Sequence, residues 1–193
     1  MSELAKDTTE DKVLNGVNVD GIFRAIALMS CDAGAAKFQF RNRNQWITGG
    51  LNRSFVDGFY GACNEHTREA PFVLDNDEPP VLLGEDRGPN PVEQVLHGLA
   101  GCITTTLVYH AAAKGIRIDE METSFEGDLD LRGLLGIPGA KRNGYEEIRI
   151  KVRIRADGAT KEEIDELVKL AERRSPVFDI VSNPVPVKVT LDP

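Results

Sequence analysis

The chain has 193 residues, of which 41% are hydrophobic and 28% are charged, and its formal net charge is −8. This length suits one hydrophobic core with an appended segment, and the acidic balance argues against binding to nucleic acid or to an anionic membrane surface. The three cysteines, an odd number without paired spacing, argue against a disulfide framework and favour a reducing compartment, so we expect a cytoplasmic protein.

The N-terminal third is expected to form an extension followed by short strands. Residues 1–12 are predicted to be disordered, and Asn18 is expected to cap a helix that runs to about residue 36. Alternating side chains and turn signals predict strands at residues 37–46, 54–61 and 71–74, with a turn at Gly49-Gly50. Residues 75–90 are predicted to be a long connection whose carboxylates match no calcium-binding spacing.

One long helix is marked at both of its ends. Asn90 suits the N-cap, Pro91 suits the first helical position, and Gly115 is a natural residue to follow the last turn. No Asp, Glu, Lys or Arg occurs from residue 94 to 113, so we expect a helix over 91–114 that is buried on all sides, with Cys102 near its middle. Its length would span a membrane, but its glycines, threonines and histidines favour a core helix.

The C-terminal half alternates between long strands and helices. The predicted elements are strands over 116–131 and 145–156, a helix from the Thr160–Glu163 capping box to Arg174, a short helical turn over 177–181 after Ser175, and a closing strand over 185–191. The pattern indicates an α+β fold. A helix that is apolar all round needs more cover than these strands provide, which predicts a homodimer.

Four sequence blocks carry a resemblance to a known family. They are NPVEQVLHGLAGC (90–102), TTTLVYHAAAKGI (104–116), EGDLDLRG (126–133) and SPVFDIVSNPVPV (175–187), and in this order the chain resembles the OsmC/Ohr family, the osmotically inducible and organic hydroperoxide resistance proteins. The resemblance covers about residues 36–193, which leaves residues 1–35 as an N-terminal extension. It implies an OsmC-like fold, an antiparallel sheet wrapped on long central helices, in an intertwined homodimer.

The resemblance also implies a chemistry. In peroxidase members the helix cysteine attacks an organic hydroperoxide, a second cysteine forms a disulfide with the resulting sulfenate, and a dithiol restores the pair. A glutamate and an arginine orient and ionise the thiol. Cys102 matches the reactive cysteine, but Ser175 stands in place of the second cysteine. Val92 takes the place of the glutamate, and Glu93 follows one residue later.

The residues themselves leave the role of Cys102 open. Thiol chemistry needs a thiolate, which a nearby cation or a helix N-terminus favours. Cys102 lies eleven residues beyond Pro91, where the dipole of its own helix has faded, so the activating group would have to be an arginine. The resemblance implies an arginine from the N-terminal hairpin, and Arg41 and Arg43 lie in that region. The alternative is a small buried hydrophobic residue, and Ser175 can equally be a plain N-cap.

Two functions therefore remain in view. One is a thiol-dependent protein that reduces organic hydroperoxides through a single cysteine with the help of a dithiol reductant. The other is a non-catalytic protein that binds a small apolar ligand or serves as a stress-associated scaffold. No cofactor or metal is predicted, because His66, His97 and His110 lack metal-ligand spacing. A Cys–His hydrolase is disfavoured because His110 lies about 12 Å farther along the helix axis than Cys102 and His97 lies on a different face, which leaves only His66 as a base.

Overall fold

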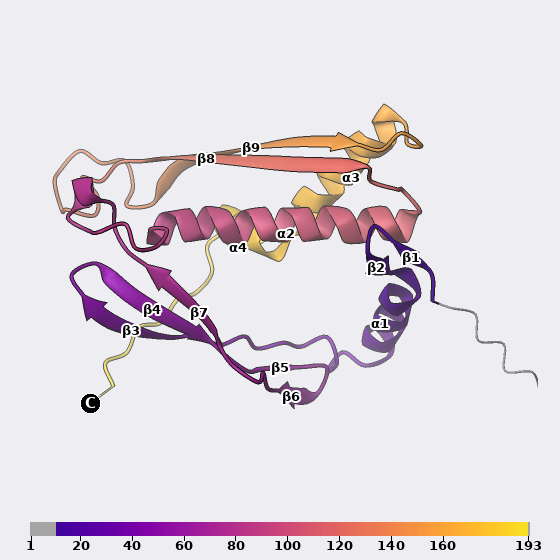
Figure 1. Cartoon of the computed structure of the whole chain (residues 1–193), viewed down its shortest axis with the longest axis horizontal. Helices are drawn as coiled ribbons and strands as arrows, with labels where there is room; N and C mark the ends of the chain where they lie inside the picture. The colour runs from indigo at the N-terminus through magenta and orange to yellow at the C-terminus, as the bar shows by residue number, and fades with distance from the viewer. Residues whose placement is uncertain (1–10, 193) are drawn as a thin grey trace, which may run out of the picture.

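The structure, a computed structural model that describes residues 11–192, has a long central helix covered on one side by an antiparallel hairpin (Figure 1). In chain order the elements are β1 (Val13–Leu14), β2 (Val17–Asn18), α1 (Val19–Cys31), β3 (Arg43–Thr48), β4 (Leu51–Val56), β5 (Phe59–Gly61), β6 (Asn64–His66), β7 (Phe72–Asn76), the 3-10 turn η1 (Pro80–Leu82), α2 (Pro91–Lys114), β8 (Glu120–Leu129), β9 (Tyr145–Arg155), α3 (Lys161–Arg174) and α4 (Pro176–Ser182). The predicted α+β class is confirmed.

The central helix α2 begins and ends where its sequence signals predict. The Asn90 side chain accepts a hydrogen bond from the Glu93 backbone N–H at 2.8 Å, and the Glu93 carboxylate accepts one from the Asn90 N–H at 2.8 Å. This capping box satisfies two backbone donors at the helix start. Gly115 ends the helix in the left-handed conformation, with φ of 77°, which glycine adopts without steric cost.

The core lies between α2, α3 and the β8–β9 hairpin. Leu99, Ile103, Leu107 and Ala111 follow one another at four-residue spacing, so they share one face of α2. They pack with Leu167 of α3 and with the inward side chains of the hairpin, namely Met121, Phe125, Ile148, Ile150, Val152 and Ile154. The two long strands pair antiparallel, with Glu120 opposite Arg155, and their outer faces carry the charged residues.

The prediction that α2 is buried on all sides is wrong within a single chain. Gly98, Gly101 and Thr105 are exposed, Tyr109 is 51% exposed, and a Cβ added at either glycine would meet no atom within 4 Å. In Figure 1, β8 and β9 run along one side of α2, whereas β5 and β6 lie on its other side. Although α2 has the length and mean hydropathy, 1.2, of a membrane span, its opposite face packs into the core like that of a core helix.

The N-terminal elements differ from the prediction in their bounds. Asn18 caps α1 as predicted, but the helix ends at Cys31, five residues early, because Asp32 turns the chain. Strand β3 begins at Arg43, since only Gln39 pairs before it, in a single bridge to Tyr60. Strand β6 was not predicted at all. Of the predicted disordered segment, residues 1–12, residues 1–10 lie outside the described residues, whereas the backbone of Lys12 bonds Val19 and Asp20.

The long connection before α2 is ordered by one carboxylate. Asp77 is buried, and its side chain accepts hydrogen bonds from the backbone N–H groups of Glu78, Glu85 and Arg87. Burial opposes ionisation of Asp77, but these three donors outweigh it and lower the pKa of the carboxyl group. The acidic loop is thus built around an internal anchor.

The predicted closing strand over 185–191 does not form within the described residues. After α4 the chain runs extended and leaves the body of the molecule (yellow in Figure 1). Alternate side chains along it are increasingly exposed, from Val185 at 47% and Val187 at 78% to Val189 at 92% and Leu191 at 96%. The alternation is typical of a strand, but among the described residues no partner strand pairs with this segment.

Candidate functional site

The Cys102 thiol lies where α2 meets the first turn of α4. The side chain is half-buried, and its sulfur accepts a hydrogen bond from the backbone N–H of Val177 at 3.5 Å. Val177 is the second residue of α4, and its N–H is among the groups at a helix start that have no partner within the helix. Such N–H groups are donors for a sulfur anion or for the oxygen of an oxidised sulfur.

Ser175 begins the helix turn whose backbone donates to this sulfur. It is 2% exposed, and its hydroxyl oxygen accepts a hydrogen bond from the Phe178 N–H at 3.3 Å, so it is the N-cap of α4. Cys102 and Ser175 therefore accept from backbone donors one residue apart on the same turn. The structure brings these two predicted site residues together, and it also bears out the N-cap interpretation of Ser175.

Glu93 lies apart from the thiol. Its carboxylate is the second half of the α2 capping box and accepts from the Asn90 backbone, nine residues before Cys102. Val92, at the position that the family resemblance gives to the glutamate, lines a cleft, and its carbonyl oxygen accepts a hydrogen bond from the Tyr145 hydroxyl at 2.9 Å. Glu93 thus has a structural task in this chain.

The two arginines proposed as activators contact other residues within the described part of the chain. Arg41 forms an ion pair with Glu65, with its two terminal nitrogens 2.7 and 3.1 Å from the carboxylate oxygens. The Arg43 guanidinium stacks on the Phe55 ring at 4.2 Å from the ring centre. Both side chains are exposed, so neither is committed to the core.

The histidines have separate surroundings. The His66 ring stacks on Phe59 and contacts the Gly61 carbonyl oxygen at 3.0 Å. Burial, and then the positive charges of Arg174 and Lys114, lower the pKa of His110. Among residues 11–192 no three His, Cys, Asp or Glu side chains gather as metal ligands do.

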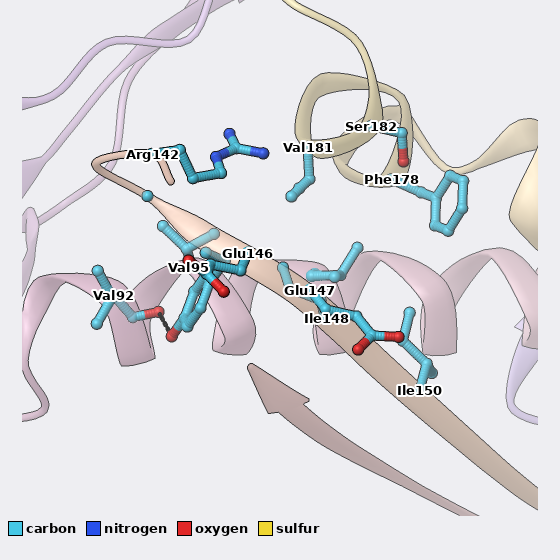
Figure 2. Close-up of a pocket in the computed structure, with 13 residues that line it drawn as sticks. Val92, Val95, Arg142, Glu146, Glu147, Ile148, Ile150, Phe178, Val181 and Ser182 are labelled. Carbon is cyan, nitrogen blue, oxygen red and sulfur yellow. Dashed lines mark hydrogen bonds between the residues drawn. The ribbon is translucent and has the colours of Figure 1, made fainter. Parts of the chain in front are cut away.

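A cleft of about 510 Å³ opens beside the first turn of α4, the turn that contacts the Cys102 sulfur (Figure 2). Its floor is apolar, and the Arg142 guanidinium extends across its mouth toward Val181. We call it the α2–β9–α4 cleft. Its lining residues are Val92, Val95 and Leu99 of α2; Arg142 and Gly144 of the loop before β9; Tyr145, Glu146, Glu147, Ile148 and Ile150 of β9; and Phe178, Val181 and Ser182 of α4. Leu99 lies three residues before Cys102, so the cleft and the thiol are neighbours on α2.

Sequence reasoning missed the α4 backbone as a partner of the thiol. It rejected a helix N-terminus because it considered only the start of α2, the helix that carries Cys102. The Ser175-Pro176 pair does mark the start of α4, but no local pattern tells that α4 packs against the middle of α2. The cleft was missed for the same reason, because it is formed by three elements distant in sequence.

Comparisons with known proteins agree with this architecture. The family model described as OsmC-like protein matches residues 84–190. An OsmC-like protein from Mycoplasma pneumoniae is 18% identical with a TM-score of 0.58, over 76% of this chain and 89% of that one. An OsmC-like protein of unknown function from Vibrio cholerae is 10% identical with a TM-score of 0.53, over 73% and 92%.

The organic hydroperoxide resistance protein OhrB of Bacillus subtilis is similar at 20% identity and a TM-score of 0.47, over 77% of this chain and 96% of that one. No protein with a curated description matches the sequence. The first two structural likenesses show the fold, and the family model spans more than half of the chain. By fold and by sequence, the chain belongs to the OsmC-like family.

Proposed function

We propose that this protein reduces organic hydroperoxides through the single thiol of Cys102. The observation that carries the proposal is the position of the half-buried sulfur, which accepts the Val177 N–H at the first turn of α4. A buried filler would be surrounded by aliphatic groups, whereas this sulfur meets a polar donor and retains partial exposure. Membership of the family and the hydroperoxide resistance named for relatives support the same chemistry.

The reaction would proceed in balanced steps. The Cys102 thiolate attacks the outer oxygen of the hydroperoxide, so the O–O bond breaks, the alcohol leaves with a proton, and the cysteine becomes a sulfenate. The Ser175 hydroxyl cannot form a disulfide, so an external thiol attacks the sulfenate sulfur and releases water. The second thiol of a dithiol reductant then displaces this mixed disulfide and restores Cys102. The reductant leaves as a disulfide.

The α2–β9–α4 cleft has the apolar lining that an apolar substrate would need for binding. Its lining includes the apolar side chains of Val95, Leu99 and Phe178, next to the turn of α4 that contacts the thiol. An organic hydroperoxide with an alkyl or aryl group would bury its apolar part there, and burial of apolar area is the main driving force for such binding.

The cation that assists the thiol would come from a second copy of the chain. Arg41 and Arg43 are exposed on the β3 side of the molecule, where an intertwined subunit could present either one to the Cys102 of its partner. The bare face of α2, with Gly98 and Gly101, would accommodate a close approach of another backbone.

The homodimer is part of the proposal. Strands β3 and β7 are the edges of the β3–β4–β7 sheet, and unpaired edges accept further strands. We propose that the valine row of residues 185–191 pairs with such an edge of the other subunit. Val189→Asp should then shift sedimentation from dimer to monomer at micromolar concentration, and Lys188→Asp, on the opposite side of the same segment, should not. A monomeric wild type would contradict this arrangement.

Hydroperoxide consumption tests the enzymatic part. Cumene hydroperoxide should be consumed by the wild-type protein with dihydrolipoamide and not by Cys102→Ser. Cys31→Ser and Cys63→Ser should retain the activity, because both thiols lie outside the site. Equal rates for wild type and Cys102→Ser would refute the proposal.

A non-catalytic binding protein is the second candidate, favoured by Ser175 in place of a thiol and by Glu93 in the helix cap. In that case the cleft would bind an apolar ligand, and Val181→Trp would block binding while Cys102→Ser left it intact. For either function we propose a cytoplasmic location, in keeping with the unpaired cysteines.

A further inference from the structure

Cys63 lies close to the residue that follows Cys31, on the side of the molecule that carries α1, and neither cysteine has a role in the proposed reaction. Both are exposed free thiols. Cys31 is the last residue of α1, and Cys63 lies in the turn between β5 and β6. The two elements are brought together by Asp32, the residue after Cys31, whose carboxylate accepts a hydrogen bond from the Cys63 thiol at 3.9 Å.

The segment that follows Cys31 is held firmly against the hairpin turn. The Asp32 N–H donates to the Leu28 carbonyl oxygen at 2.9 Å, and the other oxygen of the Asp32 carboxylate accepts from the Gly34 N–H at 2.8 Å. A Cβ added at Gly34 would lie 3.6 Å from the Cys63 sulfur. The Cys63 sulfur therefore lies next to Asp32 and Gly34, one and three residues after Cys31.

The turn that presents Cys63 has an unusual sequence for its backbone. Ala62 and Cys63 both have positive φ, 48° and 63°, in the two-residue loop that joins Gly61 to its pair Asn64. Such loops favour Asn-Gly, because residues with a Cβ resist this conformation. A cysteine here is costly for the turn, and non-glycine residues in this region concentrate at functional positions.

We propose that Cys31 and Cys63 form a reversible disulfide that fastens the end of α1 to the β5–β6 hairpin under oxidising conditions. The oxidant is a low-molecular-weight disulfide such as oxidised glutathione. One cysteine thiolate attacks it, giving a mixed disulfide and one glutathione thiolate. The second cysteine attacks the mixed sulfur and releases the other glutathione. The two protein thiols lose two protons and two electrons, and the small disulfide is reduced to two thiols.

The bond requires the Cα atoms to come within about 7 Å, and the exposed last turn of α1, which Cys31 ends, is the element that would move to bring them there. Fastening this end would fix a helix whose Phe23, Ile26 and Leu28 side chains are each more than half exposed. The redox state of the pair would thus control how freely an apolar helix can move on the surface. This inference does not rest on the reactivity of Cys102.

Oxidation of the folded full-length protein tests the proposal. After incubation of reduced protein with oxidised glutathione, peptide mapping should find a bond between Cys31 and Cys63 within one chain, and the protein should run as a monomer on a non-reducing gel. The thermal midpoint should rise by several degrees and return after addition of dithiothreitol. Cys102→Ser should show the same bond and the same rise.

Cys31→Ser and Cys63→Ser should each lose both the bond and the rise in thermal midpoint. Separate glutathione adducts on the two cysteines without a bond between them would overturn the proposal. So would a bond that forms only in urea, or one that joins either residue to Cys102.

Discussion

Ser175→Cys tests the geometry of the candidate site directly. In the wild type, Cys102 and Ser175 accept from the neighbouring N–H groups of Val177 and Phe178, at 3.5 and 3.3 Å. A cysteine at position 175 would direct its sulfur at the same helix turn, within reach of the Cys102 sulfur. We expect the two thiols to form a disulfide on mild oxidation.

The expected gain in stability follows from the length of chain that the bond closes. A loop of about 70 residues corresponds to about 4 kcal/mol of lost freedom in the unfolded chain. The substitution also removes the hydroxyl that caps α4, which costs about 1 kcal/mol. The oxidised variant should therefore be more stable than wild type by about 3 kcal/mol, or roughly 6–12 °C in thermal midpoint for a chain of this size.

Calorimetry of oxidised and dithiothreitol-reduced protein, together with a count of free thiols, measures this gain. Ser182→Cys, at the exposed far end of α4, is the matched control and should leave the midpoint unchanged under both conditions. An oxidised Ser175→Cys variant that keeps all its thiols free, with equal midpoints in both states, would show that the two side chains do not face each other. The reasoning on the site would then fail.

Three further outcomes follow from the core, the titration of a histidine and the N-terminal anchor. Leu107→Ala should lower the free energy of unfolding in urea by about 3–5 kcal/mol, because Leu107 is 0% exposed, whereas Leu83→Ala at 94% exposure should change it by less than about 0.5 kcal/mol. His110 has a lowered pKa in the fold, so the unfolded chain takes up its proton at a higher pH than the folded chain does. The free energy of unfolding, measured by urea titration, should therefore fall as the pH drops below about 6.5, and His110→Gln should make that fall smaller. The Asn15 side chain bonds the backbone of Ile116 and Ile118 at 2.9 Å each, so Asn15→Ala should hasten amide exchange in β1 and β2 while leaving α3 unchanged.

The helices could be predicted closely because their signals are local. Asn90 and Gly115 fix the two ends of α2 through hydrogen bonds and backbone angles that depend on a few neighbouring residues. The Thr160–Glu163 capping box fixes the start of α3 in the same way. The short strands were less predictable, because a strand such as β6 exists only through the partner it pairs with.

The candidate site could be predicted in its members but not in its arrangement. Cys102 and Ser175 were both identified, and they meet at one turn of α4. Their meeting depends on how α4 packs across α2, where Val177 contacts Cys102 over a separation of 75 residues in the sequence. No periodicity in the sequence encodes this packing. Glu93 comes one residue after the position at which the family resemblance places its glutamate, and the capping box shows that its carboxylate binds the Asn90 backbone instead.

The same limit explains the face of α2 that stays bare. An uncharged helix predicts burial all round, but the sequence does not say which chain supplies the cover. Within one chain, the core takes the face of Leu99 and Leu107, and the face of Gly98 and Gly101 remains open. Since exposing an apolar helix face to water is unfavourable, the free energy of covering it is available to a second subunit, and that subunit would arrive on the side of α2 where small residues permit the closest approach. A thiol that needs a cation from outside its own chain would then be complete only in the assembled pair, so dilution below the dissociation constant should abolish hydroperoxide turnover before it unfolds the subunits.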